Sequence, residues 1–186
     1  MSALERQQRG LLDLIKGRGA PPQDAYFAQV AHSAGPVMVR EIALWWRAMQ
    51  LDVQCRYTSR LLKRTSRFEG LVAAYFDAHA TSSFVEELSR DFLQTLQTDA
   101  DVLVAATAGF EYALMEAHAD SSESFEILWD RDPDAVVVAL EQRSALPPPD
   151  ADWTYRMRVG AGVPNLVRCS RERKQFRVDN VREPIP

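Results

Sequence analysis

The sequence predicts a mainly helical α+β protein, with an N-terminal helical bundle followed by a small antiparallel β-sheet and one covering helix. Three observations predict this architecture. Apolar residues recur at helical spacing through the first two thirds of the 186 residues. From about residue 125 the pattern changes to short apolar runs that alternate with polar residues. The apolar fraction of 46% supports a sizeable core without disulfides or metals.

The first half of the chain is predicted to contain three helices. Leu4, Leu11 and Ile15 lie on one stripe of a first helix that is expected to end near Gly17. A short second helix is expected from about residue 22 until the pair 35–36, Gly-Pro, stops it. The periodic pattern over 37–64 then predicts one long helix, straight or bent.

Three more helices are expected before the pattern changes. The first is centred on Phe68 to Phe76, and the second follows candidate caps at 81–83 and runs to Leu96. Asp99 or Asp101 is expected to open the third, which fades in the polar stretch 120–124. We therefore expect residues 1–120 to form a helical domain.

Residues 121–186 are expected to form a small strand-helix-strand domain with a basic C-terminal end. Phe125 to Trp129 predicts a strand, and a helix is expected from Asp132 to about Leu140. The prolines at 147–149 predict a stiff linker. Strands are then expected over 153–159 and 165–170, joined by a turn at the glycines 160 and 162.

Charge is distributed unevenly, although the net charge is only −4. Residues 99–152 carry 13 acidic and two basic side chains, whereas residues 153–186 carry eight basic and three acidic ones. Either the two segments neutralise each other in the fold, or the basic end is a docking surface. Its arginines alternate with apolar residues and no helix-turn-helix features are present, so a nucleic-acid interface is not favoured.

No catalytic constellation is evident in the sequence. A nucleophile with a base, metal ligands at helical spacing and a phosphate-binding loop are all missing. The remaining metal-site alternative joins His79, Glu111 and His118, which would have to converge from distant helices. We therefore expect no catalytic residue, no metal and no cofactor in this chain.

The cysteines and the N-terminus predict a cytoplasmic protein. Cys55 and Cys169 lie far apart and show no CxxC spacing, so reduced thiols are expected. The first residues lack the apolar stretch of a secretory signal, and no run of 18 apolar residues exists.

A set of helical residues resembles a known domain. The set comprises Arg60, Leu61, Leu62, Phe68, Ala74, Tyr75, His79, Leu88, Phe92, Leu93 and the run Phe110 to Glu116. Over about residues 4–118 it resembles the helical domain, once labelled DNA-binding, of accessory proteins that pair with multinuclear iron-dependent oxidases. Within that group the short chain and its strand-helix-strand end are most similar to the MbnC family of methanobactin biosynthesis proteins. Two positions depart from the pattern, because many relatives have Tyr-Arg at Trp46-Arg47 and His-Pro at His79-Ala80.

The resemblance implies a non-catalytic accessory subunit. Its partner would be a TIM-barrel iron oxidase of the MbnB kind, and the two chains would form a heterodimer with the iron in the partner. The complex would convert cysteines of an MbnA-like precursor peptide to oxazolone and thioamide groups, as in the biosynthesis of the copper chelator methanobactin. The chain itself would help to bind the leader part of that peptide.

Two sets of residues are candidates for these contacts. The short sheet is expected to accept the peptide as an added strand, because a small sheet leaves an open edge. The candidate peptide-binding residues are Tyr155, Arg156, Met157, Arg158, Leu166, Val167, Arg168 and Cys169. Arg156 and Arg158 share one strand face by period-two spacing, so both are expected to select acidic leader residues. Trp45 and Trp46 fit either the core or, with Arg47, the partner interface.

Two other classes of function stay open at this point. A DNA-binding transcriptional regulator would be retained on DNA in a salt-sensitive way, because each phosphate contact releases counterions. A stand-alone metal enzyme would carry stoichiometric metal when purified alone.

Overall fold

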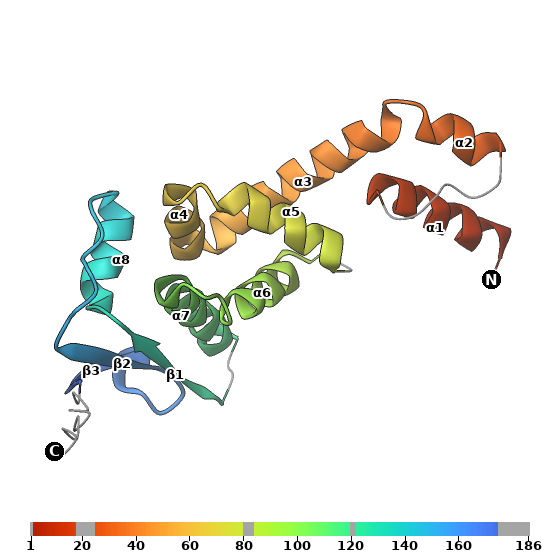
Figure 1. Ribbon diagram of the computed structural model, residues 1–186. Helices are drawn as coiled ribbons and strands as arrows, with labels where there is room; N and C mark the ends of the chain where they lie inside the picture. Colours follow the sequence, from red (N-terminus) through yellow and green to blue (C-terminus); the bar gives the residue numbers. More distant parts are fainter. Residues whose placement is uncertain (1, 18–24, 80–83, 120–121, 175–186) are drawn as a thin grey trace, which may run out of the picture. The chain divides into compact units, whose positions relative to one another are not determined.

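The computed structural model describes residues 2–17, 25–79, 84–119 and 122–174, and it confirms the predicted fold class (Figure 1). The described chain is mainly helical and contains a three-stranded antiparallel sheet. It divides into two compact units, Met1–Phe92 and Leu93–Pro186, whereas the sequence placed a boundary at residue 120. Helix α7 (Val102–His118) falls in the second unit because it packs against the sheet.

The first unit is built around a long helix, α3. Its described helices are α1 (Ala3–Ile15), α2 (Ala25–Ala31), α3 (Gly35–Gln54), α4 (Arg56–Arg64), α5 (Phe68–Ala78) and the first part of α6 (Val85–Leu96). Helix α3 contacts α1, α2, α4 and α5, so it connects the unit from end to end. Gly35 and Pro36 begin α3, rather than stopping the helix before them, because proline fits a first helical turn.

The long helix predicted over 37–64 is divided at Cys55. Its backbone there has φ −101° and ψ 58°, which ends α3 and lets α4 begin in a new direction. The Cys55 side chain is fully buried, and its sulfur lies 4.0 Å from the carbonyl oxygen of Ser89. It therefore serves as a small apolar core residue, as free cysteines often do.

The core of the first unit is formed where α3, α4, α5 and α6 meet. Its buried side chains are Leu51, Leu61, Leu62, Phe68, Val72, Tyr75, Phe76, Leu88 and Phe92. The rings of Tyr75 and Phe92 pack edge to face with centroids 5.5 Å apart. Most of these aromatic residues carry the resemblance described above, so their spacing reflects core packing.

The second unit places α7 against the sheet. Its strands are β1 (Ser124–Trp129), β2 (Trp153–Gly160) and β3 (Val167–Arg173), and they lie in the sheet in the order β1-β2-β3. Along the chain, α8 (Pro133–Gln142) connects β1 to β2, and a short 3-10 helix η1 (Pro164–Leu166) precedes β3. Helix α7 contacts β1 and β2, and a Cβ added at Gly109 would lie 3.5 Å from Ile127 Cγ1. The large buried side chains of this unit include Phe110, Ile127, Trp129, Val136, Leu140, Met157 and Val159.

The proline segment 147–149 is fixed to the second unit. Arg131 lies in the loop between β1 and α8, and its guanidinium donates a hydrogen bond to the Pro147 carbonyl at 2.9 Å. The amide of Asp150 donates to the Asp130 carbonyl at 2.8 Å. The Asp150 carboxylate in turn accepts hydrogen bonds from the amides of Asp152 and Trp153 and from the Tyr155 hydroxyl. These backbone and side-chain hydrogen bonds lower the pKa of Asp150.

Gly160 is expected to be the glycine least tolerant of substitution. Its φ is +117°, and a Cβ there would lie 2.4 Å from the backbone oxygen of Glu123. Gly160→Ala should therefore lower the free energy of unfolding by about 3 kcal/mol, combining backbone strain with overlap. Gly162→Ala is the matched control, since Gly162 has φ +71° but nothing within 4 Å of a Cβ. It should cost only about 1 kcal/mol; equal losses in urea denaturation would contradict this explanation.

Candidate functional site

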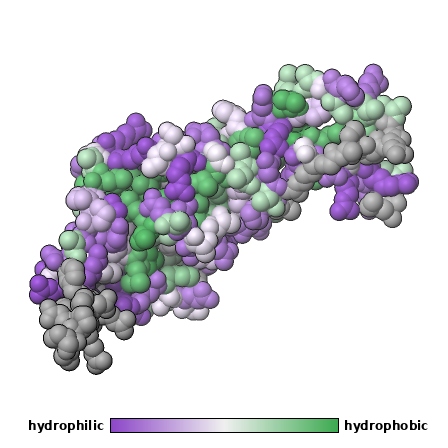
Figure 2. Space-filling view, viewed as in Figure 1, coloured by the Kyte–Doolittle hydropathy of each residue, from purple (hydrophilic) through white to green (hydrophobic). Residues whose placement is uncertain are grey.

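Helix α3 exposes a continuous row of large apolar side chains, which we call the α3 apolar surface. It consists of Val37, Met38, Val39, Ile42, Trp45, Trp46, Met49 and Val53. Met38, Ile42, Trp45 and Met49 follow one another at spacings of four, three and four, so they share one helix face. Figure 2 shows apolar side chains reaching the surface along this helix. A contiguous exposed apolar area of this kind marks an interaction site in soluble proteins.

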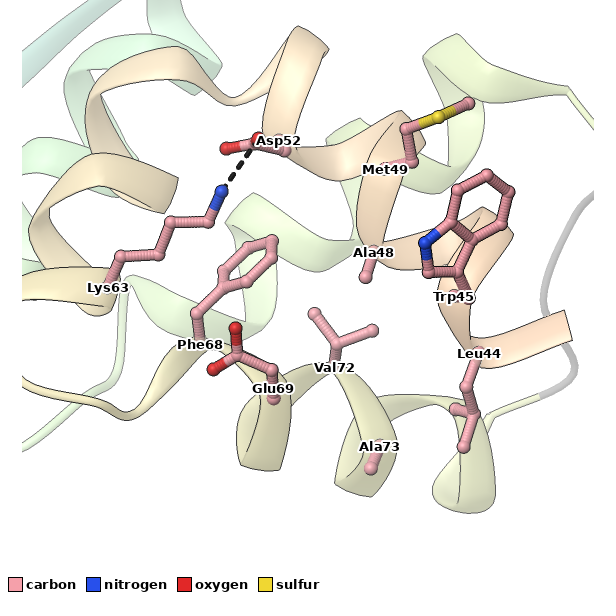
Figure 3. A pocket seen from close by; sticks show the side chains of 10 residues that line it. All are labelled: Leu44, Trp45, Ala48, Met49, Asp52, Lys63, Phe68, Glu69, Val72 and Ala73. Atoms are coloured by element: carbon pink, nitrogen blue, oxygen red, sulfur yellow. Dashed lines mark ion pairs between the residues drawn. The ribbon is translucent and has the colours of Figure 1, made fainter. Parts of the chain in front are cut away.

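An apolar pocket lies beside this surface, between α3 and α5 (Figure 3). Its volume is about 540 Å³, and it is lined by Leu44, Trp45, Ala48, Met49, Asp52, Lys63, Phe68, Glu69, Val72 and Ala73. Trp45 and Met49 form one edge of it, and Phe68 and Val72 lie across from them. A pocket of this size and composition fits an apolar ligand or protruding side chains of a partner.

One end of the pocket is closed by an ion pair. Lys63 Nζ lies 2.7 Å from Asp52 Oδ2 and 5.1 Å from the centre of the Phe68 ring. Burial alone would raise the pKa of Asp52, but hydrogen bonds from Lys63 and Ser59 outweigh it and lower that pKa. The Asp52 carboxylate is therefore charged at neutral pH, at the rim of an otherwise apolar pocket.

The predicted interface residues Trp45, Trp46 and Arg47 lie together on α3. Trp45 is 63% exposed and lines the pocket, and the Trp46 ring lies 6.1 Å from it and is also exposed. The interpretation of both tryptophans as core residues, which the sequence pattern favoured, is wrong because both rings are exposed. Arg47 is half-buried and donates a 3.4 Å hydrogen bond to Gln50 Oε1. The sequence analysis missed Phe68 and Val72 as pocket residues, because their helical spacing also fits a closed core.

The sheet presents two different faces. Met157 and Val159 are buried together with Ile127 and Trp129 on the inner face. Met157 was predicted to bind the peptide but instead packs in the core, because period-two alternation turns it inward. Tyr155 is on the same side, half-buried, and its hydroxyl donates to Asp150 Oδ2 at 2.9 Å.

Arginine and glutamate side chains occupy the outer face. Arg156 forms ion pairs with Glu126 on β1 and Glu172 on β3, so it is neutralised from both neighbouring strands. These pairs raise the pKa of Arg156. Arg158 and Arg168 are exposed and stand directly opposite each other on β2 and β3. The two arginines that the sequence grouped by spacing, Arg156 and Arg158, are thus in different electrostatic environments.

Strand β3 is an edge of the sheet. It pairs with β2 on one side, and no described strand pairs with its other side. Val167 is half-buried and Cys169 exposed on this strand, whereas Leu166 precedes it with a left-handed φ of +65°. An extended peptide can hydrogen-bond to such an edge through its own backbone.

The described residues show no arrangement typical of a catalytic centre. No group of three or more His, Cys, Asp or Glu side chains that could hold a metal occurs within the ranges described above. Desolvation, followed by the carboxylates of Asp134 and Asp132, raises the pKa of the Cys169 thiol. A thiol with a raised pKa is mostly protonated at neutral pH and is a poor nucleophile.

Comparisons of the chain with family models, with curated proteins and with solved structures found no match. Among the described helices, none combines the length and apolarity needed to cross a lipid bilayer.

Proposed function

We propose that this chain is a non-catalytic accessory subunit that binds a partner enzyme through the α3 apolar surface. The observation that carries the proposal is the row of eight exposed large apolar residues on one helix, next to a pocket of about 540 Å³. Trp45 and Trp46 expose large apolar ring surface to water, and aromatic residues are enriched in the centres of protein interfaces.

The partner proposed is a TIM-barrel multinuclear iron oxidase of the MbnB kind. The support is the resemblance of residues 4–118 to the accessory proteins of such oxidases, carried by residues such as Phe68, Tyr75 and Phe92. In this division of labour the partner supplies the iron and the oxidation chemistry. This chain supplies binding surfaces, of which the α3 apolar surface is the first.

The second role proposed is to hold the leader of an MbnA-like precursor peptide at the sheet. The edge of β3 with which no described strand pairs supports it, because backbone hydrogen bonds to an edge strand tolerate different peptide sequences. Val167, Arg168 and Cys169 lie on that edge strand, and Arg158 lies next to it on β2. In this arrangement the complex oxidises cysteines downstream of a leader that this chain retains.

Co-expression with an MbnB-like oxidase tests the proposal. The two chains should elute together in affinity and then size-exclusion chromatography, with iron in the complex and none above background in this chain purified alone. The peptide should be modified by the complex only. Stoichiometric iron in the isolated chain, or conversion of a cysteine peptide by that chain alone, would favour a stand-alone metal enzyme. Salt-sensitive retention on DNA without oxidase binding would favour a transcriptional regulator.

A further inference from the structure

The outer face of the sheet contains a pair of like charges. Arg158 on β2 and Arg168 on β3 are direct cross-strand partners, and both side chains are exposed. Side chains directly opposite each other in an antiparallel pair have Cβ atoms about 4.5–5.5 Å apart, and like charges at this position destabilise the pairing. Neither guanidinium has an ion-pair or hydrogen-bond partner among the described residues.

Arg156, on the same face of the sheet, differs from Arg158 and Arg168 because it does have ion-pair partners. Arg156 has the same environment of strands but is flanked by the carboxylates of Glu126 and Glu172. Glu126 is the register partner of Arg158 on β1, yet its carboxylate pairs with Arg156. Both glutamates of this face therefore pair with Arg156, whereas Arg158 and Arg168 repel each other.

We propose that Arg158 and Arg168 form a binding site for one carboxylate of an acidic residue in a peptide bound along β3. A carboxylate has two oxygens that accept hydrogen bonds from guanidinium groups, so one Asp or Glu side chain can engage both arginines. Its charge also removes the repulsion between them. The inference rests on the proposed peptide role of the sheet and adds a specificity to it: the residue recognised is acidic.

The surrounding charges favour a single carboxylate over a polyphosphate chain. Glu126 and Glu172 lie on the same face as the arginine pair, on the two outer strands. A nucleic-acid backbone that followed the arginines would bring successive phosphates close to these carboxylates. A peptide strand at the β3 edge brings one acidic side chain to Arg158 and Arg168 and leaves its neighbours free of that repulsion.

Fluorescence anisotropy with the full chain tests this site. The probes are the labelled leader of the MbnA-like precursor peptide and variants in which each Asp or Glu is changed singly to Asn or Gln. Arg158→Gln and Arg168→Gln should each weaken leader binding about three- to fivefold, as expected for exposed charge pairs. One amidated leader should bind equally weakly to the wild type and to both variants. Arg173→Gln is the matched control, because it removes the same charge from the opposite face of β3; it should leave leader binding unchanged.

A stability measurement on the free chain completes the test. Arg168→Glu should replace repulsion by attraction, raise the melting temperature by about 1–3 °C and abolish the preference for acidic leaders. If the leader binds but Arg158→Gln and Arg168→Gln bind it as the wild type does, this inference is overturned and the peptide role stands. If the wild type binds no leader, both are overturned. Tighter binding of a double-stranded DNA oligonucleotide than of the leader, lost in the same two variants, would overturn the choice of a peptide.

Discussion

Phe92→Ala is expected to lower the free energy of unfolding by about 3–5 kcal/mol, because it removes a large ring from a closed core. Phe92 is only 1% exposed and packs edge to face on Tyr75. Tyr75 is buried as well, and desolvation by this burial is the main reason that its pKa is raised to about 12. Such a loss is a large part of a typical domain stability of about 5–15 kcal/mol.

Urea denaturation followed by circular dichroism measures this effect. Phe84→Ala is the control, since Phe84 is 68% exposed just before the same helix, α6. Its loss should stay within about 0.5–1 kcal/mol, as for most surface substitutions. An unchanged midpoint for Phe92→Ala would show that this ring does not stabilise the fold.

The second large effect is expected at the partner interface. Trp45→Glu should weaken binding to the iron oxidase proposed as partner by about 30- to 1000-fold, the range for the loss of a central aromatic contact. It places a charge beside Met49 at the edge of the apolar pocket, where a bound partner would leave it without water. Because Trp45 is largely exposed in the free chain, its melting temperature should change little.

Surface plasmon resonance with the immobilised oxidase measures the dissociation constant. Val138→Glu is the matched control, since Val138 is an exposed apolar residue on α8, in the other compact unit. It should bind as the wild type does. Wild-type affinity in Trp45→Glu, or equal losses in both variants, would place the interface elsewhere.

Helical periodicity was sufficient to predict the fold class and most helices. Asp99 or Asp101 was expected to open α7, and Asp101 is the cap. The Asp132-Pro133 start of α8 was identified correctly, because capping is a local property of the sequence. The break at Cys55 was not placed, since neither glycine nor proline marks it. At the break the Cys55 sulfur lies against the Ser89 carbonyl, which is 34 residues away in the sequence. Gly35 and Pro36 were expected to stop the second helix, whereas they begin α3. Glycine and proline occur at both kinds of helix boundary, so the sequence did not distinguish a stop from a start.

The candidate sites depended more strongly on tertiary structure. A helix with apolar residues on more than one face can bury them in its own chain or keep them for a partner, and the pattern around Trp45 does not distinguish these. The spacing of Arg156 and Arg158 predicted a shared face correctly. Only the strand register showed that Arg156 is neutralised and that Arg158 faces Arg168. Contacts between strands distant in sequence cannot be derived from spacing alone.

The two sides of helix α3 differ in how strongly a mutation affects the stability of the fold. Leu51 is fully buried and holds the first unit together, so its substitution is penalised through loss of the fold. Ile42, Trp45 and Met49 point outward, and their replacement leaves that core intact. Mutations can therefore accumulate on the outer side without unfolding the protein, and the exposed surface can change while the helix itself persists.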